Sequence, residues 1–259
     1  MFPIPRIIAV ANQKGGVGKT ATVAALGAAL AEAKRRVLLV DLDPQANLSL
    51  SCGLHPTDGR PGAYEVLMDP GTPAMAAIVP SAWERLAVLP STNQLASAEV
   101  ELVHASQRTA RLSAKLSVID GFDYVLVDTP PSLGFLTLNA LTAATSVIIP
   151  LQASFLALEG LRQLMTTISA VREHGNPGLA IAGIVLTMFD HRTLHAQQVR
   201  QRVSEHFGDL LFATPVRRSV IFDYATVAGE PVVYHSPTHP CSQAYRDLAK
   251  ELIARAEST

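Results

Sequence analysis

The chain carries the segment Asn12-Gln13-Lys14-Gly15-Gly16-Val17-Gly18-Lys19-Thr20 between an apolar, β-branched run at residues 5–11 and an alanine- and leucine-rich run at residues 21–34. The first run predicts a buried strand, and the second, which contains no proline, predicts a helix. A glycine-rich loop that joins a strand to a helix and ends in Gly-Lys-Thr is typical of a phosphate-binding loop. Its backbone N–H groups and the positive end of the helix dipole both favour a bound phosphate.

Two lysines stand in this loop, where the common pattern has one. Lys19 would reach the β- and γ-phosphates, and the Thr20 hydroxyl would ligate Mg²⁺. Gln13 occupies a position that is usually glycine, and Lys14 precedes the glycine pair directly. Lys14 is either a solvated charge near the nucleotide or a residue that acts on the phosphates. The loop around it favours the second interpretation.

Continuous apolar runs alternate with helical patterns along the rest of the chain. The predicted strands are residues 36–41, 86–90, 124–128, 146–150, 181–187 and 210–213. The predicted helices are residues 63–68, 98–118, 136–144, 157–174, 194–207 and 242–256. Apolar strands that alternate with helices predict an α/β fold of the P-loop NTPase type: a doubly wound, mostly parallel sheet with helices on both faces. We expect a single domain over residues 1–259.

Bulk composition is consistent with a compact protein that is not coated in basic charge. Charged residues make up 17% of the chain, and the net charge is −1. The apolar runs at residues 144–151 and 179–186 are far shorter than the roughly 20 residues that span a bilayer. Two cysteines, Cys52 and Cys241, match no metal or redox spacing, so we expect ordinary thiols in a reducing cytosol.

Two of the predicted strands end in aspartate, where the phosphates of a bound nucleotide would lie. Asp128 ends one, and Asp43 follows the other just before Pro44. A carboxylate in such a place can hold Mg²⁺ or its water shell. For Asp43 the alternatives are the positioning of an attacking water or a purely local role in the loop. The Pro130–Pro131 pair would stiffen the segment after Asp128, as a phosphate-sensing switch needs.

These motifs together resemble the ParA family of partition ATPases, a deviant phosphate-loop class that also contains MinD and the nitrogenase iron protein. The resemblance is carried by residues 14–20, Asp41-Leu42-Asp43-Pro44-Gln45 and Asp128-Thr129-Pro130-Pro131-Ser132, and further segments extend it over nearly the whole chain. Asp-Leu-Asp-Pro-Gln favours ParA over MinD. Because the loop begins at residue 12, we expect the small form without an N-terminal DNA-binding domain.

The resemblance implies an ATP-driven dimer switch that hydrolyses ATP with Mg²⁺, slowly without a partner. Lys14 would cross the interface to the other subunit's phosphates, much as an arginine finger does. Asp43 would manage the attacking water, and Asp128 would support the metal. The implied metal-associated residues are Thr20, Asp43 and Asp128. The implied nucleotide-binding residues are Lys14, Gly15, Gly16, Val17, Gly18, Lys19, Thr20, Ala21, Arg217 and Ser219.

Arginines near the C-terminus depart from the family pattern. Relatives show Pro-Arg-Asn where this chain has Arg217-Arg218-Ser219, so Arg217 and Ser219 would flank the adenine. The arginines of residues 191–218 form either a solvated helix face or a patch that contacts DNA phosphates without reading sequence. Under the second interpretation the contacts are Arg192, Arg217 and Arg218. The implied partners are a second copy of the chain, non-specific DNA and a ParB-like protein, in the cytoplasm at the nucleoid.

Three other functions are weaker on sequence grounds. A MinD-type membrane-surface ATPase needs a C-terminal amphipathic anchor, but the last helix has no aromatic residue near its end and carries both charge signs. An iron–sulfur reductase needs paired cysteines after the switch segments. A small-molecule kinase needs an acceptor site, whereas Lys14 and Asp43 serve pairing and water attack.

Overall fold

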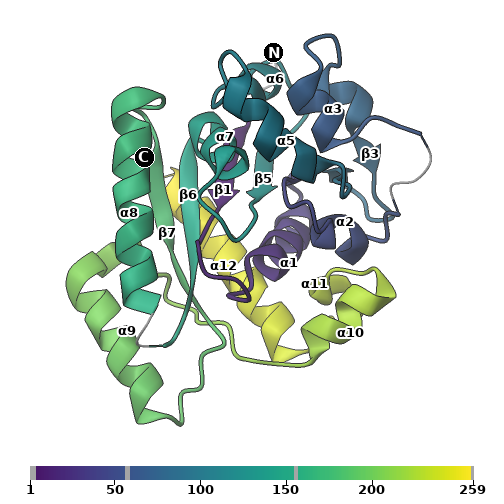
Figure 1. Cartoon of the computed structure of the whole chain (residues 1–259). Coiled ribbons are helices and arrows are strands. Elements are labelled where there is room, and N and C mark those ends of the chain that lie inside the picture. The colour runs from purple at the N-terminus through teal and green to yellow at the C-terminus, as the bar shows by residue number, and fades with distance from the viewer. Residues whose placement is uncertain (1–3, 56–58, 155–156, 258–259) are drawn as a thin grey trace.

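A seven-stranded sheet forms the centre of the computed structural model, which describes residues 4–55, 59–154 and 157–257 (Figure 1). The strand order is β3-β4-β2-β5-β1-β6-β7. The strands are β1 (Arg6–Val10), β2 (Val37–Asp41), β3 (Val79–Pro80), β4 (Leu86–Leu89), β5 (Tyr124–Asp128), β6 (Ser146–Gln152) and β7 (Ala180–Thr187). Only the short edge strand β3 pairs antiparallel; the other pairs are parallel. The predicted doubly wound α/β fold is confirmed.

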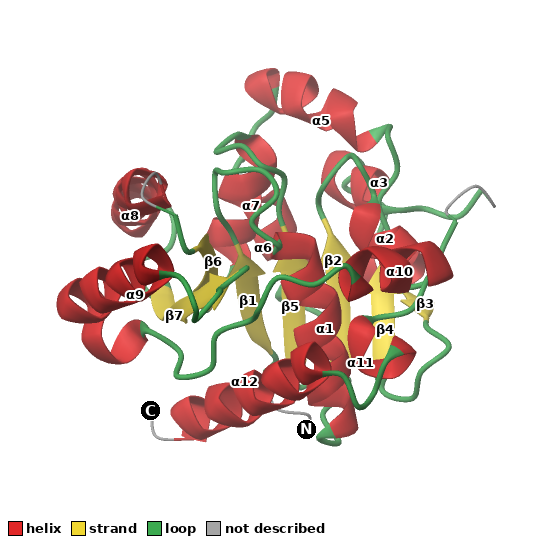
Figure 2. Cartoon of the chain, turned by 90° about the horizontal axis from the view of Figure 1, so that it is seen from below, coloured by secondary structure: helices red, strands yellow, loops and turns green. Residues whose placement is uncertain are grey.

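Helices cover both faces of this sheet, as Figure 2 shows. One face packs against α3 (Ala63–Met68), α4 (Ala74–Ala77), α5 (Leu95–Glu101), α6 (Arg111–Leu116), α7 (Phe135–Ala143), α8 (Ala157–His174) and α9 (Leu194–Phe207). The other packs against α1 (Lys19–Glu32), α2 (Asn47–Ser51), α10 (Ile221–Ala228), α11 (Val232–His235) and α12 (Pro240–Glu257). Because β1 leads into α1 on one face and β5 leads toward α7 on the other, the strand ends between them form the crevice in which such sheets bind ligands.

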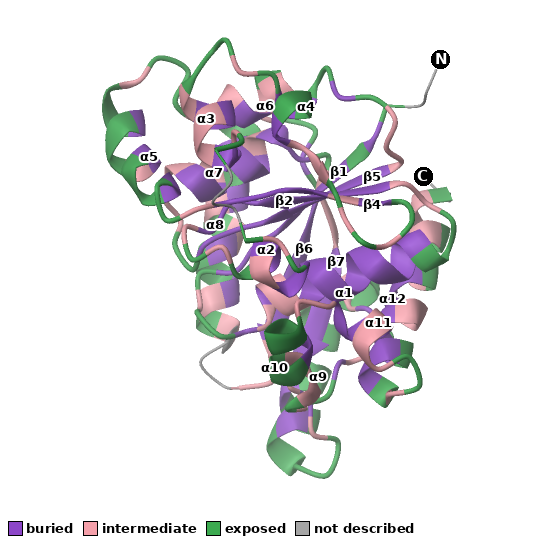
Figure 3. Ribbon diagram, turned by 90° about the vertical axis from the view of Figure 1, so that its right-hand side faces the viewer, coloured by how far each residue is buried: buried purple, intermediate pink, exposed green. Residues whose placement is uncertain are grey.

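Helix α1 is buried along almost its whole length, and it is central to its layer (Figure 3). Its small residues let the backbone approach the sheet closely: a Cβ added at Gly27 would lie 2.5 Å from Leu39 Cδ2. Helix α12 packs along it, and the Tyr245 hydroxyl lies 3.0 Å from Thr22 Oγ1. Helix α1 is therefore held between the sheet, which it approaches at Gly27, and α12, which it contacts at Thr22.

Several element boundaries differ from the sequence prediction. The helix predicted at residues 98–118 is divided into α5, a 3₁₀ turn at Leu102–His104, and α6, because Gln107 adopts a left-handed φ of 51° that a helix cannot contain. The strand predicted at residues 210–213 is wrong: Gly208–Leu210 is a 3₁₀ turn, and Leu211 makes only an isolated bridge to Ile184. Helices α2, α10 and α11 were not predicted, since β-branched and aromatic residues in α10 and α11 lower their helix propensity.

Candidate functional site

The glycine-rich loop wraps around the N-terminus of α1. Gly16 and Gly18 have φ values of 69° and 84°, which side chains with a Cβ rarely adopt. The helix begins at Lys19, so its first N–H groups face the space that the loop encloses. Thr187, at the carboxyl end of β7, donates its hydroxyl to the Val17 carbonyl over 2.8 Å and anchors the loop from the sheet.

The two lysines of the loop have different environments. Lys19 is 6% exposed, and its Nζ contacts only the Lys14 carbonyl, at 3.3 Å, among the hydrogen bonds described for it. Burial lowers the pKa of Lys19, and the nearby Asp128 and Asp43 oppose this shift. Lys14 points elsewhere: its Nζ donates to Gln152 Oε1 at 2.8 Å and to Ser154 Oγ at 3.4 Å. Lys19 thus presents a charge to the loop's own pocket, and Lys14 does not.

Two buried aspartates lie side by side at the ends of β2 and β5, where Asp41 pairs in register with Asp128. Asp41 accepts hydrogen bonds from Ser49 N at 2.9 Å, Ser49 Oγ at 2.7 Å and Asp43 N at 3.1 Å. Burial nevertheless raises the pKa of Asp41 to about 6.

Asp128 has no such support. Its carboxylate is fully buried, and neither oxygen accepts a hydrogen bond of good geometry from the described residues. Burial and then the charge of Asp41 raise the pKa of Asp128 well above its usual range, although Thr20 and Lys19 lie near enough to oppose the shift. A buried carboxylate without partners is rare, and a bound cation is one explanation for it.

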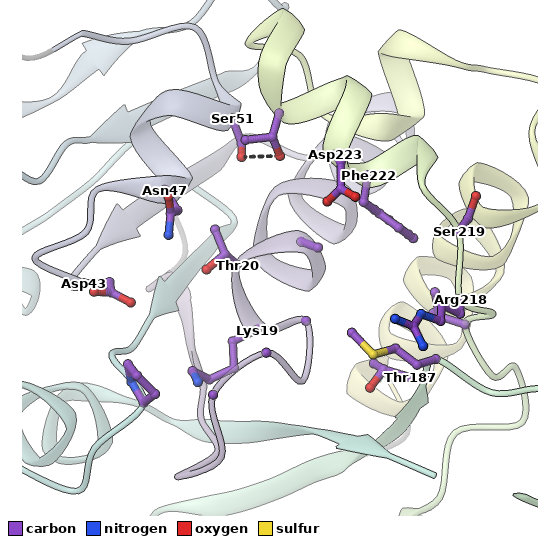
Figure 4. A pocket seen from close by; sticks show the side chains of 18 of the residues that line it. Lys19, Thr20, Asp43, Asn47, Ser51, Thr187, Arg218, Ser219, Phe222 and Asp223 are labelled. Carbon is purple, nitrogen blue, oxygen red and sulfur yellow. Dashed lines mark hydrogen bonds between the residues drawn. The ribbon is translucent and has the colours of Figure 1, made fainter. Parts of the chain in front are cut away.

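Asp43 lies at the mouth of the same site, 7% exposed. Its Oδ1 accepts the Gln45 backbone N–H at 2.9 Å, so it also fixes the local turn. Figure 4 shows Asp43 across a gap from Lys19 and Thr20. The local role and the catalytic role considered for this residue are thus compatible.

The donor set fits a hard, oxygen-liganded cation. Mg²⁺ characteristically uses one or two carboxylates together with substrate phosphates and water, rather than a complete cage of side chains. Consistent with this, the described residues contain no cluster of three or more acidic, His or Cys side chains able to hold a metal alone. Thr20, Asp43 and the unpartnered Asp128 would hold Mg²⁺ with the nucleotide, and the ion would neutralise the charge of the phosphates.

A cavity of about 530 Å³ extends from the loop toward α10. One end is formed by the loop, Thr20 and Asp43; the other is formed by Arg217, Arg218, Ser219, Phe222 and Asp223 (Figure 4). The space between is further bounded by Asn47, Ser51 and Thr226. The cavity thus offers a phosphate end and a longer end with polar groups and the aromatic ring of Phe222, as a nucleoside triphosphate needs.

Most of the predicted site residues meet in this cavity. Gly15, Gly16, Gly18, Lys19, Thr20, Ala21, Asp43, Arg217, Arg218 and Ser219 all line it. Lys14 and Asp128 lie beside it, and Val17 is buried beneath the loop. Arg192 is separate: it does not line the cavity, and it forms an ion pair with Asp190 at 2.9 Å.

Sequence reasoning missed Asn12 and Thr187, although each serves the loop. Asn12 donates from Nδ2 to the Pro150 carbonyl at 2.7 Å and accepts the Lys14 N–H at 2.9 Å. Thr187 could have been found, because ligand sites in open α/β sheets lie at the carboxyl ends of strands. Asn12 gave no signal beyond its place in the loop.

A family model described as an AAA domain matches residues 5–181. The chain is 46% identical to the chromosome partitioning protein ParA of Caulobacter vibrioides, over 96% of this chain and 94% of that protein. It is 44% identical to the sporulation initiation inhibitor protein Soj of Bacillus subtilis, over 96% of this chain and 98% of the relative. The chain belongs to the ParA family of partition ATPases. This ParA-family protein is an ATPase whose cofactors are ATP and Mg²⁺.

Solved structures agree with this assignment. The ParA-family chain superposes with a TM-score of 0.85 on a Mycobacterium smegmatis protein named cobyrinic acid a,c-diamide synthase, with a bound ATP analogue and magnesium; the two are 41% identical over 98% and 97% of their lengths. The septum site-determining protein MinD of Pyrococcus horikoshii, complexed with Mg-ADP, gives a TM-score of 0.77 at 26% identity, over 97% of each chain. Among the described residues of this ParA-family protein, no helix is long and apolar enough to cross a bilayer.

Proposed function

We propose that this protein is a partition ATPase that dimerises on binding ATP, holds DNA non-specifically as the ATP dimer, and segregates or positions DNA or another cargo with a ParB-like partner. Hydrolysis of ATP to ADP and phosphate would end the paired state, and DNA binding would keep the protein at the nucleoid. The relatives named for chromosome partitioning support the cellular process.

The position of the Lys14 side chain is the observation that supports dimerisation on ATP. A second lysine in a phosphate-binding loop would be expected to add charge to the loop's own pocket, yet Lys14 Nζ lies against Gln152 and Ser154 and does not line that pocket. A cation that lies beside one nucleotide site, but outside it, supports the proposal that Lys14 acts on the nucleotide of another subunit. There it would neutralise charge that develops during phosphoryl transfer.

Within this proposal each remaining site residue has a distinct role. Lys19 binds the phosphates of its own nucleotide, and Thr20 and Asp128 support Mg²⁺ directly or through water. Asp43 orients the attacking water, because it is the carboxylate at the open end of the phosphate site. Arg217 and Ser219 contact the base or ribose at the other end of the cavity.

Dimerisation in ATP and Mg²⁺, measured by size-exclusion chromatography with light scattering, tests the proposal. We expect Lys14→Ala to remain monomeric and Asp43→Ala to accumulate as a dimer, because the first loses the trans contact and the second loses water attack. Lys250→Ala is the matched control, since Lys250 is an exposed lysine on α12. A Lys14→Ala protein that pairs like the wild type would refute the trans role.

DNA binding is tested separately, by gel shift at low salt with ATP. We expect retention by wild type and loss of retention by Arg217→Ala/Arg218→Ala, with a smaller effect of Arg192→Ala because Arg192 is neutralised by Asp190. Arg162→Ala, at an exposed arginine paired with Glu159, is the control. Because Arg217 and Arg218 also line the cavity, ATP binding is measured in parallel. Unchanged retention by the double variant, with ATP bound, would remove these residues from the DNA interface.

The MinD-type alternative is weakened by α12. Its apolar residues Ala244, Tyr245, Leu248, Ala249 and Leu252 are buried in the core beside α1. An amphipathic membrane anchor needs a free apolar face. Sedimentation with anionic vesicles in ATP should therefore leave the protein in the supernatant.

A further inference from the structure

Lys14 is held inside its own subunit by two neutral acceptors at the end of β6. The shorter contact, 2.8 Å to Gln152 Oε1, has the length of a strong charge-assisted hydrogen bond, and Ser154 Oγ lies at 3.4 Å. Gln152 is the last residue of β6, and Ser154 follows in a tight turn in which its N–H donates to the Gln152 carbonyl at 2.7 Å. The acceptors therefore lie at the carboxyl end of an inner strand and in the turn that follows it directly.

The backbone of Lys14 is tied to the same strand. Asn12 links the Lys14 N–H to the Pro150 carbonyl, two residues before Gln152, through bonds of 2.9 and 2.7 Å. The Lys14 carbonyl accepts Lys19 Nζ at 3.3 Å. The start of the phosphate loop and the end of β6 thus form one hydrogen-bonded unit, so the docked position of the Lys14 side chain is set by the core.

We infer that Gln152 and Ser154 are positioning residues that hold Lys14 in its own subunit until a phosphate on a second subunit replaces them. This inference rests on the proposed trans role of Lys14. A lysine docked on its own β6 cannot also reach across an interface, so docking competes with pairing. Phosphate oxygens are anionic acceptors and bind an ammonium group more strongly than an amide or hydroxyl oxygen does.

The competition makes pairing depend on the nucleotide. Lys14 gives up its hydrogen bonds to Gln152 and Ser154 only when the nucleotide of the second subunit brings enough negative charge close to it. ATP carries one more phosphate than ADP and therefore brings more charge. Gln152 and Ser154 therefore raise the dissociation constant of the dimer and suppress pairing of subunits that lack ATP. They act through Lys14, since neither of them lines the cavity of its own subunit.

Two substitutions of similar size at one position test the inference in opposite directions. Gln152→Leu removes the acceptor, and Gln152→Glu replaces it by a carboxylate that pairs with Lys14. With a non-hydrolysable ATP analogue and Mg²⁺, we expect the dimer dissociation constant from analytical ultracentrifugation to fall about three- to tenfold in Gln152→Leu, the range for one hydrogen bond. We expect it to rise by at least as much in Gln152→Glu. Ser154→Ala should shift it less, in the direction of Gln152→Leu.

Controls separate this role from folding and from the proposed function. Unfolding midpoints identify any variant that fails to fold, and a fluorescent ATP analogue gives the affinity of the monomer, which should match wild type. Shifts in the same direction for Gln152→Leu and Gln152→Glu, or none in either, would overturn the docking role. If Lys14→Ala is monomeric in that case, the proposed function stands and only the docking role of Gln152 and Ser154 is refuted. If Lys14→Ala pairs normally, the proposed function itself has failed.

Discussion

Asp41 and Asp128 place two carboxyl groups next to each other in the dry interior of the sheet. Such groups lose hydration on folding, and the charge of Asp41 further raises the pKa of Asp128. Asp41 is compensated by three donors, whereas Asp128 relies on Lys19 and Thr20 nearby. In the free protein, burial and repulsion from Asp41 therefore oppose the ionisation of Asp128 at the point where Mg²⁺ is expected. A bound cation would relieve this repulsion.

The pH dependence of unfolding should show this charge. The pKa of Asp41 is about 6 in the folded protein, above the usual value near 3.9 of an unfolded chain. Between those values the folded state keeps a proton that the unfolded state has lost, so stability is greatest at the acidic end of the window and is lost as pH rises to about 6. We expect the free energy of unfolding of wild type, relative to Asp41→Asn, to fall by about 2 kcal/mol from pH 4 to pH 7.

Urea denaturation of the nucleotide-free proteins at several pH values measures this difference. The amide introduced by Asp41→Asn cannot accept from every donor that the carboxylate serves, so the variant also carries a loss that does not depend on pH. Removal of the Asp41 charge relieves Asp128 too, which adds to the expected trend in the same direction. A wild-type-to-variant difference that stays constant with pH would contradict the assigned cause.

At the residue scale, the sequence indicates where a side chain lies when its position follows from local spacing. Lys19, Thr20, Asp43 and Asp128 each stand at a strand end or helix start that the sequence marks, and parallel strands bring those ends together. The contacts of Gln152 and Thr187 with the loop depend on β6 and β7 following β1 in the sheet, and one sequence does not state that order. The arginines were ambiguous for another reason: Arg217 and Arg218 are as suitable for a nucleotide as for DNA, and only the fold places them on the cavity.

At the level of elements, the close packing of α1 on the sheet depends on Gly27, which has no side chain. Gly27 is where the helix lies closest to the sheet, and an added Cβ would meet Leu39 at 2.5 Å and Leu126 at 3.6 Å. Leu39 is fully buried and cannot move aside freely. We expect Gly27→Ala to lower the free energy of unfolding by about 1–3 kcal/mol, because overpacking exceeds the gain in helix propensity.

Gly160 provides the matched comparison in a second helix. It lies in α8, and an added Cβ there would meet nothing within 4 Å. Gly160→Ala should therefore raise the free energy of unfolding by roughly 0.5–1 kcal/mol, the usual preference for alanine in a helix. Chemical denaturation of both variants measures the contrast. Equal effects of the two substitutions would mean that close packing does not explain Gly27.

Element prediction was most successful where apolar runs are long and continuous. The range of β5 agrees residue for residue, as do those of α8 and α9, since each has clear ends in the sequence. The C-terminal third beyond α9 was less predictable. There the backbone N–H groups of Phe212 and Val216 donate to the carbonyls of Ile184 and Leu186 in β7. The segment therefore runs beside β7 without forming a strand of the sheet. Such a path is set by tertiary contacts and not by local propensity.

For the whole molecule, ligand binding and pairing should appear as separate contributions to thermal stability. A ligand that binds only the folded state at 100 times its dissociation constant adds about 2.7 kcal/mol, and pairing adds a term that depends on protein concentration. We expect the unfolding midpoint to rise with Mg²⁺ and either nucleotide. It should rise further with protein concentration only when a non-hydrolysable ATP analogue is bound.

Differential scanning fluorimetry over a hundredfold range of protein concentration tests this expectation. Lys14→Ala is the informative variant, because it should keep the gain from the nucleotide and lose the dependence on concentration. A midpoint that is independent of concentration in wild type with the ATP analogue would count against a dimer at the site.

The proposed trans role of Lys14 has a genetic consequence. In a mixed dimer of wild-type and Lys14→Ala chains, the altered chain would keep a complete nucleotide site, because the partner's Lys14 would serve it. The incomplete site belongs to the wild-type chain. The defect therefore falls on the unaltered gene product, and a Lys14 allele introduced beside a normal copy should behave as dominant, unlike an allele that simply fails to bind nucleotide.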